Sequence, residues 1–106
     1  MADKDILLRL GETIAARKDA AAGTSYVASL MAKGEDAILR KLLEEATETL
    51  LAAKEGDKLH LVRETADLWF HSLVLLACHG AGPRDVLLEL ERREGVSGIA
   101  EKAARE

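Results

Sequence analysis

Apolar residues recur at the three- and four-residue spacing of a helix along nearly the whole chain. No segment alternates apolar and polar residues in the way that a half-buried strand does. Glycines and helix-capping residues divide this pattern into five expected helices. These run over residues 3–18, between Ser25 and Gly34, from Glu35 to about Lys54, over 58–79, and from Pro83 to Gly95. The spacing therefore predicts an all-α fold, an antiparallel bundle of about five helices.

The third and fourth helices are the longest of the five, and only residues 55–57 separate them. A connection this short predicts an antiparallel helical hairpin. The composition, 48% hydrophobic and 32% charged over 106 residues, is that of one globular domain covering residues 1–106. Residues 95–106 form a short tail with room for one or two turns.

Charge and cysteine content exclude several functional classes. The net charge of −4 disfavours a nucleic-acid partner, which requires a basic surface. Cys78 is the only cysteine, so the chain forms no internal disulfide, and we expect a buried, inert thiol. The N-terminal residues lack the pattern of a signal peptide, and no apolar run approaches the roughly 20 residues that cross a bilayer. We therefore expect a soluble, cytoplasmic protein without a membrane partner.

The apolar faces of two helices suggest self-association. The chain has only three aromatic residues, and we expect two of them, Trp69 and Phe70, to pack in an otherwise aliphatic core. The leucine-rich fifth helix and the apolar stripe of the first helix leave more apolar surface than five short helices can cover. We expect these surfaces to bury against a second subunit, in a homodimer.

The third expected helix carries three glutamates on one face, Glu44, Glu45 and Glu48. At about 100° per residue they lie within an arc of about 100°, and Lys41 joins them. The same arc is compatible with a solvated surface on which Lys41 and Glu45 form an i,i+4 ion pair. This helix alone therefore does not decide between a site and an ordinary charged face.

The fourth expected helix places Glu64 and Asp67 on one stripe with His71, flanked by apolar residues. Carboxylates in such surroundings are costly unless they are ion-paired, hydrogen-bonded or bound to metal. The structural alternative is a set of buried ion pairs with nearby cations, namely Lys41, Arg40 and Arg63. A lone histidine such as His71 is more often a hydrogen-bonded core residue than a ligand.

Two neighbouring helices thus offer five carboxylates, which predict a divalent metal site. The five are Glu44, Glu45, Glu48, Glu64 and Asp67. Hard oxygen ligands of this kind suit Mg²⁺, with Mn²⁺ as a substitute. A di-iron bundle is a poorer match, because it uses Glu-x-x-His pairs and none of the three histidines follows a glutamate at that spacing.

The pattern EE-x-x-E followed by E-x-x-D resembles the signature of the all-α nucleotide pyrophosphohydrolases. The stretches SYVASLMAKGED, ADLWFH and SGIAEKAARE are more specific, and they resemble the phosphoribosyl-ATP pyrophosphohydrolases of histidine biosynthesis over about residues 5–105. The resemblance implies a hydrolase that converts phosphoribosyl-ATP to phosphoribosyl-AMP and pyrophosphate, with Mg²⁺ as cofactor. It also implies a helical homo-oligomer.

The resemblance also implies roles for individual residues. The five carboxylates match metal-binding positions, and we expect Glu45 or Glu48 to activate the attacking water. The implied substrate-binding residues are Lys41, His71, Ser25, Tyr26 and Lys33. Two alternatives remain: a house-cleaning pyrophosphatase acting on other nucleoside triphosphates, and a non-catalytic helical interaction protein.

Overall fold

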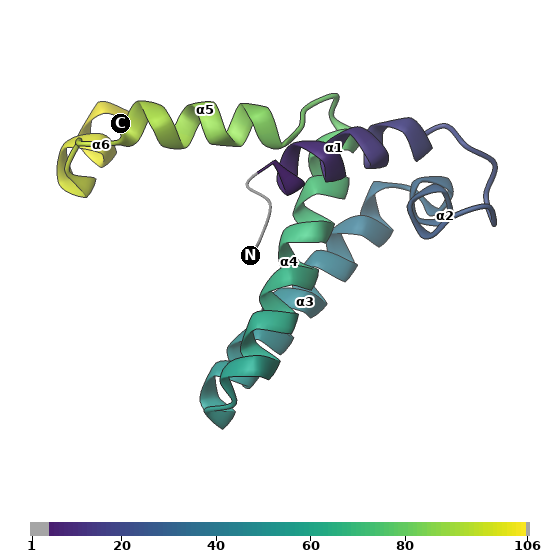
Figure 1. Ribbon diagram of the computed structural model, residues 1–106, viewed down its shortest axis with the longest axis horizontal. Coiled ribbons are helices and arrows are strands. Elements are labelled where there is room, and N and C mark those ends of the chain that lie inside the picture. The colour runs from purple at the N-terminus through teal and green to yellow at the C-terminus, as the bar shows by residue number, and fades with distance from the viewer. Residues whose placement is uncertain (1–4, 106) are drawn as a thin grey trace.

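The computed structural model describes residues 5–105, which form six helices (Figure 1). They are α1 (Ile6–Arg17), α2 (Tyr26–Lys33), α3 (Glu35–Glu55), α4 (Lys58–Cys78), α5 (Pro83–Arg93) and α6 (Gly98–Arg105). The all-α prediction is confirmed for this part of the chain. The tail expected to form one or two turns contains the eight residues of α6. Residues 3 and 4, the expected start of the first helix, lie outside the described residues.

The helices α3 and α4 form the predicted antiparallel hairpin, which runs diagonally through Figure 1. Gly56 ends α3 with a positive φ of 77°, a left-handed conformation that a residue with a Cβ adopts only at a cost. Asp57 then begins α4, because its side chain accepts a hydrogen bond from the backbone N–H of His60 at 3.1 Å. Local sequence therefore fixes the hairpin turn, and with it the alignment of the two helices.

The core lies where α1 and α2 cover the end of the hairpin that is distant from this turn. Its largest fully buried side chains are Ile14 of α1, Ile38 of α3 and Val74 of α4. Ser25 begins α2 as expected, and its Oγ accepts a hydrogen bond from the N–H of Ala28 at 3.0 Å. From the apolar stripe of α1, Ile14 is buried in this core and Leu7 and Leu10 pack against it, whereas Ile6 is 48% exposed; burial of α1 against a second subunit stays a prediction.

The helix α5 packs against α1 and, followed by α6, extends away from the hairpin (Figure 1). A Cβ on Gly11 would lie 2.4 Å from Cδ of Pro83, so α1 and α5 meet closely only because residue 11 is glycine. At the far end of this arm, Glu101 is buried and forms ion pairs with Arg92 and Arg105. The ion pair of Glu101 with Arg92 joins α6 to α5, and the pair with Arg105 lies within α6.

Two core predictions need correction. Trp69 is 56% exposed, because its side of α4 is not covered by another helix of the described chain. Cys78 is only partly buried, although it packs against the core as expected. Phe70 does pack against the core, and its ring stacks on that of Tyr26 with a centroid distance of 6.1 Å. In residues 5–105 no helix is both long and apolar enough to span a membrane.

Candidate metal centre

Three carboxylates converge between α3 and α4. Glu45 and Glu48 lie one turn apart on α3, and Glu64 faces them from α4. Each contributes one oxygen to a group whose members all lie within 4.8 Å of one another. We call these three residues the carboxylate cluster. The prediction that acidic side chains from neighbouring helices meet in one place is confirmed for them.

Burial distinguishes this cluster from a solvated acidic surface. Glu45 is only 4% exposed, and the side chain of Glu64 is 16% exposed. One buried oxygen of each, Oε2 of Glu45 and Oε2 of Glu64, has no hydrogen-bond partner in the described residues. Leaving a buried charged oxygen unpaired is costly. A hard divalent cation accepts oxygen ligands of this type, so the residues present fit such an ion.

The charges around the cluster are unevenly balanced. Lys41 Nζ lies 3.3 Å from Oε1 of Glu45 and 3.5 Å from Oε2 of Glu44, so one cation serves two carboxylates. Sharing of a proton with the neighbouring Glu64 carboxyl raises the pKa of the Glu48 carboxyl, since two adjacent carboxylates resist ionising together. The cluster therefore carries an excess of negative charge that Lys41 does not neutralise.

Two of the five predicted ligands lie outside the carboxylate cluster. Glu44 and Asp67 are both exposed, and the Glu44 carboxylate is directed to Lys41. The expectation that Asp67 is buried in an apolar stripe is wrong: Asp67 is exposed at the edge of the stripe, although His71 on the same stripe is buried. The ligand roles of both residues stay predictions.

His71 is a buried residue with both ring nitrogens hydrogen-bonded. Its Nδ1 lies 2.7 Å from the carbonyl oxygen of Asp67, and its Nε2 lies 2.7 Å from the hydroxyl of Tyr26. Because a carbonyl only accepts, Nδ1 carries the proton in the neutral ring, and the Tyr26 hydroxyl donates to Nε2. His71 is thus the hydrogen-bonded histidine considered from the sequence, and it fixes the position of the Tyr26 hydroxyl.

His60 has a structural role that the sequence interpretation missed. Its Nε2 lies 3.3 Å from Oε1 of Glu64, and its Nδ1 lies 3.1 Å from Oε2 of Glu55. The hydrogen bond to Glu55 is the largest of the effects that raise the pKa of His60. The i,i+4 spacing of His60 and Glu64 could have predicted their contact from the sequence. The contact of His60 with Glu55 could not be predicted in this way, because it depends on the geometry of the hairpin turn.

The ion pairs proposed as the structural alternative are not formed. In the part of the chain that the structure describes, neither Glu64 nor Asp67 makes a salt bridge with the cations considered, which were Lys41, Arg40 and Arg63. The i,i+4 pair of Lys41 with Glu45 does form, on α3 alone. An interhelical ion-pair network therefore does not explain the cluster.

The remaining substrate-binding candidates lie around α2. Ser25 is occupied as the N-cap of this helix. Tyr26 and Lys33, at the two ends of α2, line a pocket together with Lys41 of α3. Burial raises the pKa of the Tyr26 phenol above its usual value. Of these candidates, Lys41 contacts the carboxylate cluster, Tyr26 and Lys33 line the adjoining pocket with it, and His71 is hydrogen-bonded to Tyr26.

Comparisons with known proteins show which family this chain belongs to. The family described as Phosphoribosyl-ATP pyrophosphohydrolase matches residues 7–94. A Phosphoribosyl-ATP pyrophosphatase of Chromobacterium violaceum is 62% identical over 101 residues, which are 95% of this chain and 94% of that protein. The protein of the same name from Nitrosospira multiformis is 64% identical over 105 residues, 99% of this chain and 87% of the relative. A third, from Neisseria gonorrhoeae, is 55% identical over 100 residues and 94% of both chains.

The fold and the carboxylate cluster define an all-α protein whose two longest helices, α3 and α4, together form an acidic site. With a family match over most of its length and relatives of this identity, the chain belongs to the phosphoribosyl-ATP pyrophosphohydrolase family.

Proposed function

We propose that this chain hydrolyses phosphoribosyl-ATP to phosphoribosyl-AMP and pyrophosphate, an early step of histidine biosynthesis, in the cytoplasm. Its family and the names of its relatives support this reaction. The observation that carries the proposal is the convergence of Glu45, Glu48 and Glu64 with two buried, unpartnered oxygens. This arrangement is expected of a metal centre that binds a polyphosphate through a divalent cation.

Cation binding follows from electrostatics. Two like charges about 4 Å apart repel by about 4 kcal/mol at an effective dielectric constant of about 20, so a bare carboxylate cluster would repel a triphosphate. Glu45, Glu48 and Glu64 would hold Mg²⁺, or Mn²⁺ in its place, and Glu44 and Asp67 would join them. When bound, such an ion lowers the pKa of a water and neutralises the leaving pyrophosphate.

Glu48 is the better placed of the two candidates for activating the attacking water. Oε1 of Glu45 is engaged by Lys41, whereas Glu48 is exposed to solvent and makes no salt bridge within residues 5–105. In the proposed step the Glu48 carboxylate accepts a proton from water as the water oxygen attacks phosphorus. A P–O bond of the bridge between the α- and β-phosphates breaks, and the products are phosphoribosyl-AMP and pyrophosphate whichever of the two phosphorus atoms is attacked.

Four other side chains would bind or orient the substrate. Lys41 contacts Glu45 and also lines the adjoining pocket, so it would neutralise phosphate charge at the border of the two. Lys33, which lines the same pocket, would neutralise phosphate charge farther from the carboxylate cluster. Tyr26 would contact the substrate directly, held in place by the buried ring of His71. Ser25 would contribute by beginning α2, which carries Tyr26.

The proposed activity is tested by assaying pyrophosphate release from phosphoribosyl-ATP beside a panel of deoxynucleoside triphosphates. We expect kcat/KM to be highest for phosphoribosyl-ATP. A preference for one of the other triphosphates would indicate the house-cleaning alternative. Pyrophosphate release from none of them would indicate a non-catalytic interaction protein.

The shape of the chain supports a homodimer. A compact chain of 11.5 kDa has about 5,800 Å² of accessible surface, and this chain exposes 7,696 Å². Its radius of gyration of 15.7 Å likewise exceeds the roughly 13 Å of a compact domain of this length. The excess, about 1,900 Å², is more than the roughly 800 Å² that each partner buries in an interface of ordinary size.

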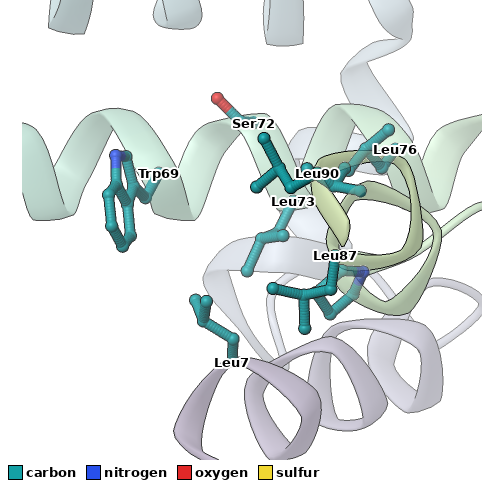
Figure 2. Close-up of a pocket in the computed structure, with 9 residues that line it drawn as sticks. Leu7, Trp69, Ser72, Leu73, Leu76, Leu87 and Leu90 are labelled. Carbon is teal, nitrogen blue, oxygen red and sulfur yellow. The ribbon is translucent and has the colours of Figure 1, made fainter. Parts of the chain in front are cut away.

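An apolar groove marks where the second copy would bind. It has a volume of about 310 Å³ and lies where α1, α4 and α5 meet (Figure 2). Figure 2 shows Leu73 and Leu76 of α4 together with Leu87 and Leu90 of α5, and Trp69 farther along α4. Exposed apolar side chains continue along α4 beyond Trp69, at Val62 and Leu59. A second copy of the same elongated chain offers a matching apolar surface.

Replacing Leu87 by aspartate is expected to convert the homodimer to a monomer, because the charge would be buried in the apolar groove. Sedimentation should give about twice the 11.5 kDa chain mass for the unmodified protein at micromolar concentration, and the single-chain mass for Leu87→Asp. Leu88→Asp, on the same helix but outside the groove, is the matched control. Dilution of the unmodified dimer should shift the fluorescence of Trp69 to the red, and a monomer at micromolar concentration would contradict the proposal.

A further inference from the structure

A second pocket, of about 380 Å³, lies between α2 and α3 beside the carboxylate cluster. Its lining residues are Tyr26, Leu30 and Lys33 of α2, and Ala37, Arg40, Lys41 and Glu44 of α3. We call it the cationic pocket, because three of its side chains are positively charged and one is negatively charged. In a chain whose net charge is −4, such an excess of positive charge is local.

The cations of this pocket are not equally engaged. Lys41 forms salt bridges with Glu44 and Glu45. Lys33 and Arg40 form none with any residue between 5 and 105. Two cationic side chains without acidic partners, at the wall of a pocket, are available to an anionic ligand. Arg40 additionally offers a planar guanidinium that binds phosphate through two hydrogen bonds.

The cationic pocket extends well beyond the carboxylate cluster. At 1.5 Å per residue along α3, Arg40 is about 12 Å from Glu48 along the helix axis, and Ala37 is about 17 Å away. Lys41 and Glu44 lie at the end of the pocket nearer the cluster. A triphosphate bound at the cluster would therefore leave the far end of the pocket, with Lys33 and Arg40, for another part of the substrate.

Phosphoribosyl-ATP has a second anionic group of the required kind. Its additional ribose carries a monophosphate, which the adenine base and a ribose separate from the triphosphate. Ordinary nucleoside triphosphates lack this group. The half-exposed ring of Tyr26 and the side chain of Leu30 provide apolar surface between the cluster and the far end of the pocket.

On the basis of the proposed function, we propose that Arg40, with Lys33, binds the monophosphate of the phosphoribosyl group. The triphosphate is then held at the carboxylate cluster, and the two anionic ends of the substrate occupy two oppositely charged parts of one site. Arg40 is in this view a specificity-determining residue. It favours phosphoribosyl-ATP over nucleotides that have only the triphosphate.

Two products that differ only by the phosphoribosyl group test this role. Phosphoribosyl-AMP and AMP both lack the leaving pyrophosphate, and only the first has the second monophosphate. We expect Arg40→Gln to raise the inhibition constant of phosphoribosyl-AMP by about tenfold or more, and that of AMP by much less. Arg40→Lys, which keeps the charge but loses the paired hydrogen bonds of the guanidinium, should restore part of the binding. Lys54→Gln, an exposed lysine at the other end of α3, is the matched control.

The same variants distinguish binding of the monophosphate in the cationic pocket from binding of the triphosphate there. For phosphoribosyl-ATP, Arg40→Gln should raise KM by a larger factor than it lowers kcat. If the inhibition constant of pyrophosphate instead rises by the same factor as that of phosphoribosyl-AMP, the pocket holds the triphosphate end and the inference is wrong. An unchanged inhibition constant for phosphoribosyl-AMP would also overturn it. Failure of the unmodified chain to hydrolyse phosphoribosyl-ATP would instead refute the proposed function.

Discussion

Replacing either Glu45 or Glu48 by glutamine is expected to lower kcat/KM for phosphoribosyl-ATP by at least about a thousandfold, equivalent to about 4 kcal/mol of transition-state stabilisation. Each substitution removes a negative oxygen that the proposed cation needs, and Glu48→Gln also removes the proposed proton acceptor. Glutamine has nearly the same shape as glutamate, so the α3–α4 hairpin should remain folded. The measurement is steady-state pyrophosphate release, with circular dichroism to monitor helix content.

Stability measurements separate loss of function from loss of fold. In the presence of a chelator, Glu48→Gln should melt at a higher temperature than the unmodified chain, because it relieves the unfavourable proximity of Glu48 and Glu64. Glu12→Gln, an exposed glutamate of α1, serves as the matched control for both activity and melting. Activity retained within about tenfold in both cluster variants would count against the roles assigned to Glu45 and Glu48.

Removing divalent cations with EDTA is expected to eliminate turnover, and adding Mg²⁺ in excess should restore it. The physical reason is the repulsion between the carboxylate cluster and the substrate triphosphate, which the contacts of Lys41 with Glu45 and of His60 with Glu64 reduce only in part. Mn²⁺ should restore activity as well, since it shares the preference for oxygen ligands. Turnover that persists after chelation would show that the reaction proceeds without the proposed ion.

Helix boundaries and the hairpin were predictable because short-range chemistry determines them. Gly56 ends α3 and Asp57 begins α4 through interactions within a few residues. The meeting of Glu45 with Glu64 was predictable for a related reason. A short turn aligns two long helices, and helical periodicity then places side chains on their shared face.

Predictions failed where they depended on what covers a helix face. Periodicity puts Trp69 opposite the acidic stripe, but it does not say that this side of α4 is left uncovered by the rest of the chain. Periodicity likewise does not say that Asp67 stays exposed while His71, one turn along the same stripe, is buried. The contact of His60 with Glu55 depends on the geometry of the hairpin turn, which the spacing along one helix does not contain. These predictions failed because the sequence pattern indicates where helices form but not which faces of a helix the other helices cover.

The central claim is that glutamates from two helices bind divalent cations together. Titration of the metal-free chain with Mn²⁺, followed by the loss of the free ion's electron paramagnetic resonance signal, measures this directly. The account predicts saturable binding that Mg²⁺ displaces, and its loss when Glu64 on α4 is replaced by glutamine, just as when Glu45 on α3 is replaced. Binding of Mn²⁺ that is unchanged in Glu64→Gln and in Glu45→Gln would contradict it.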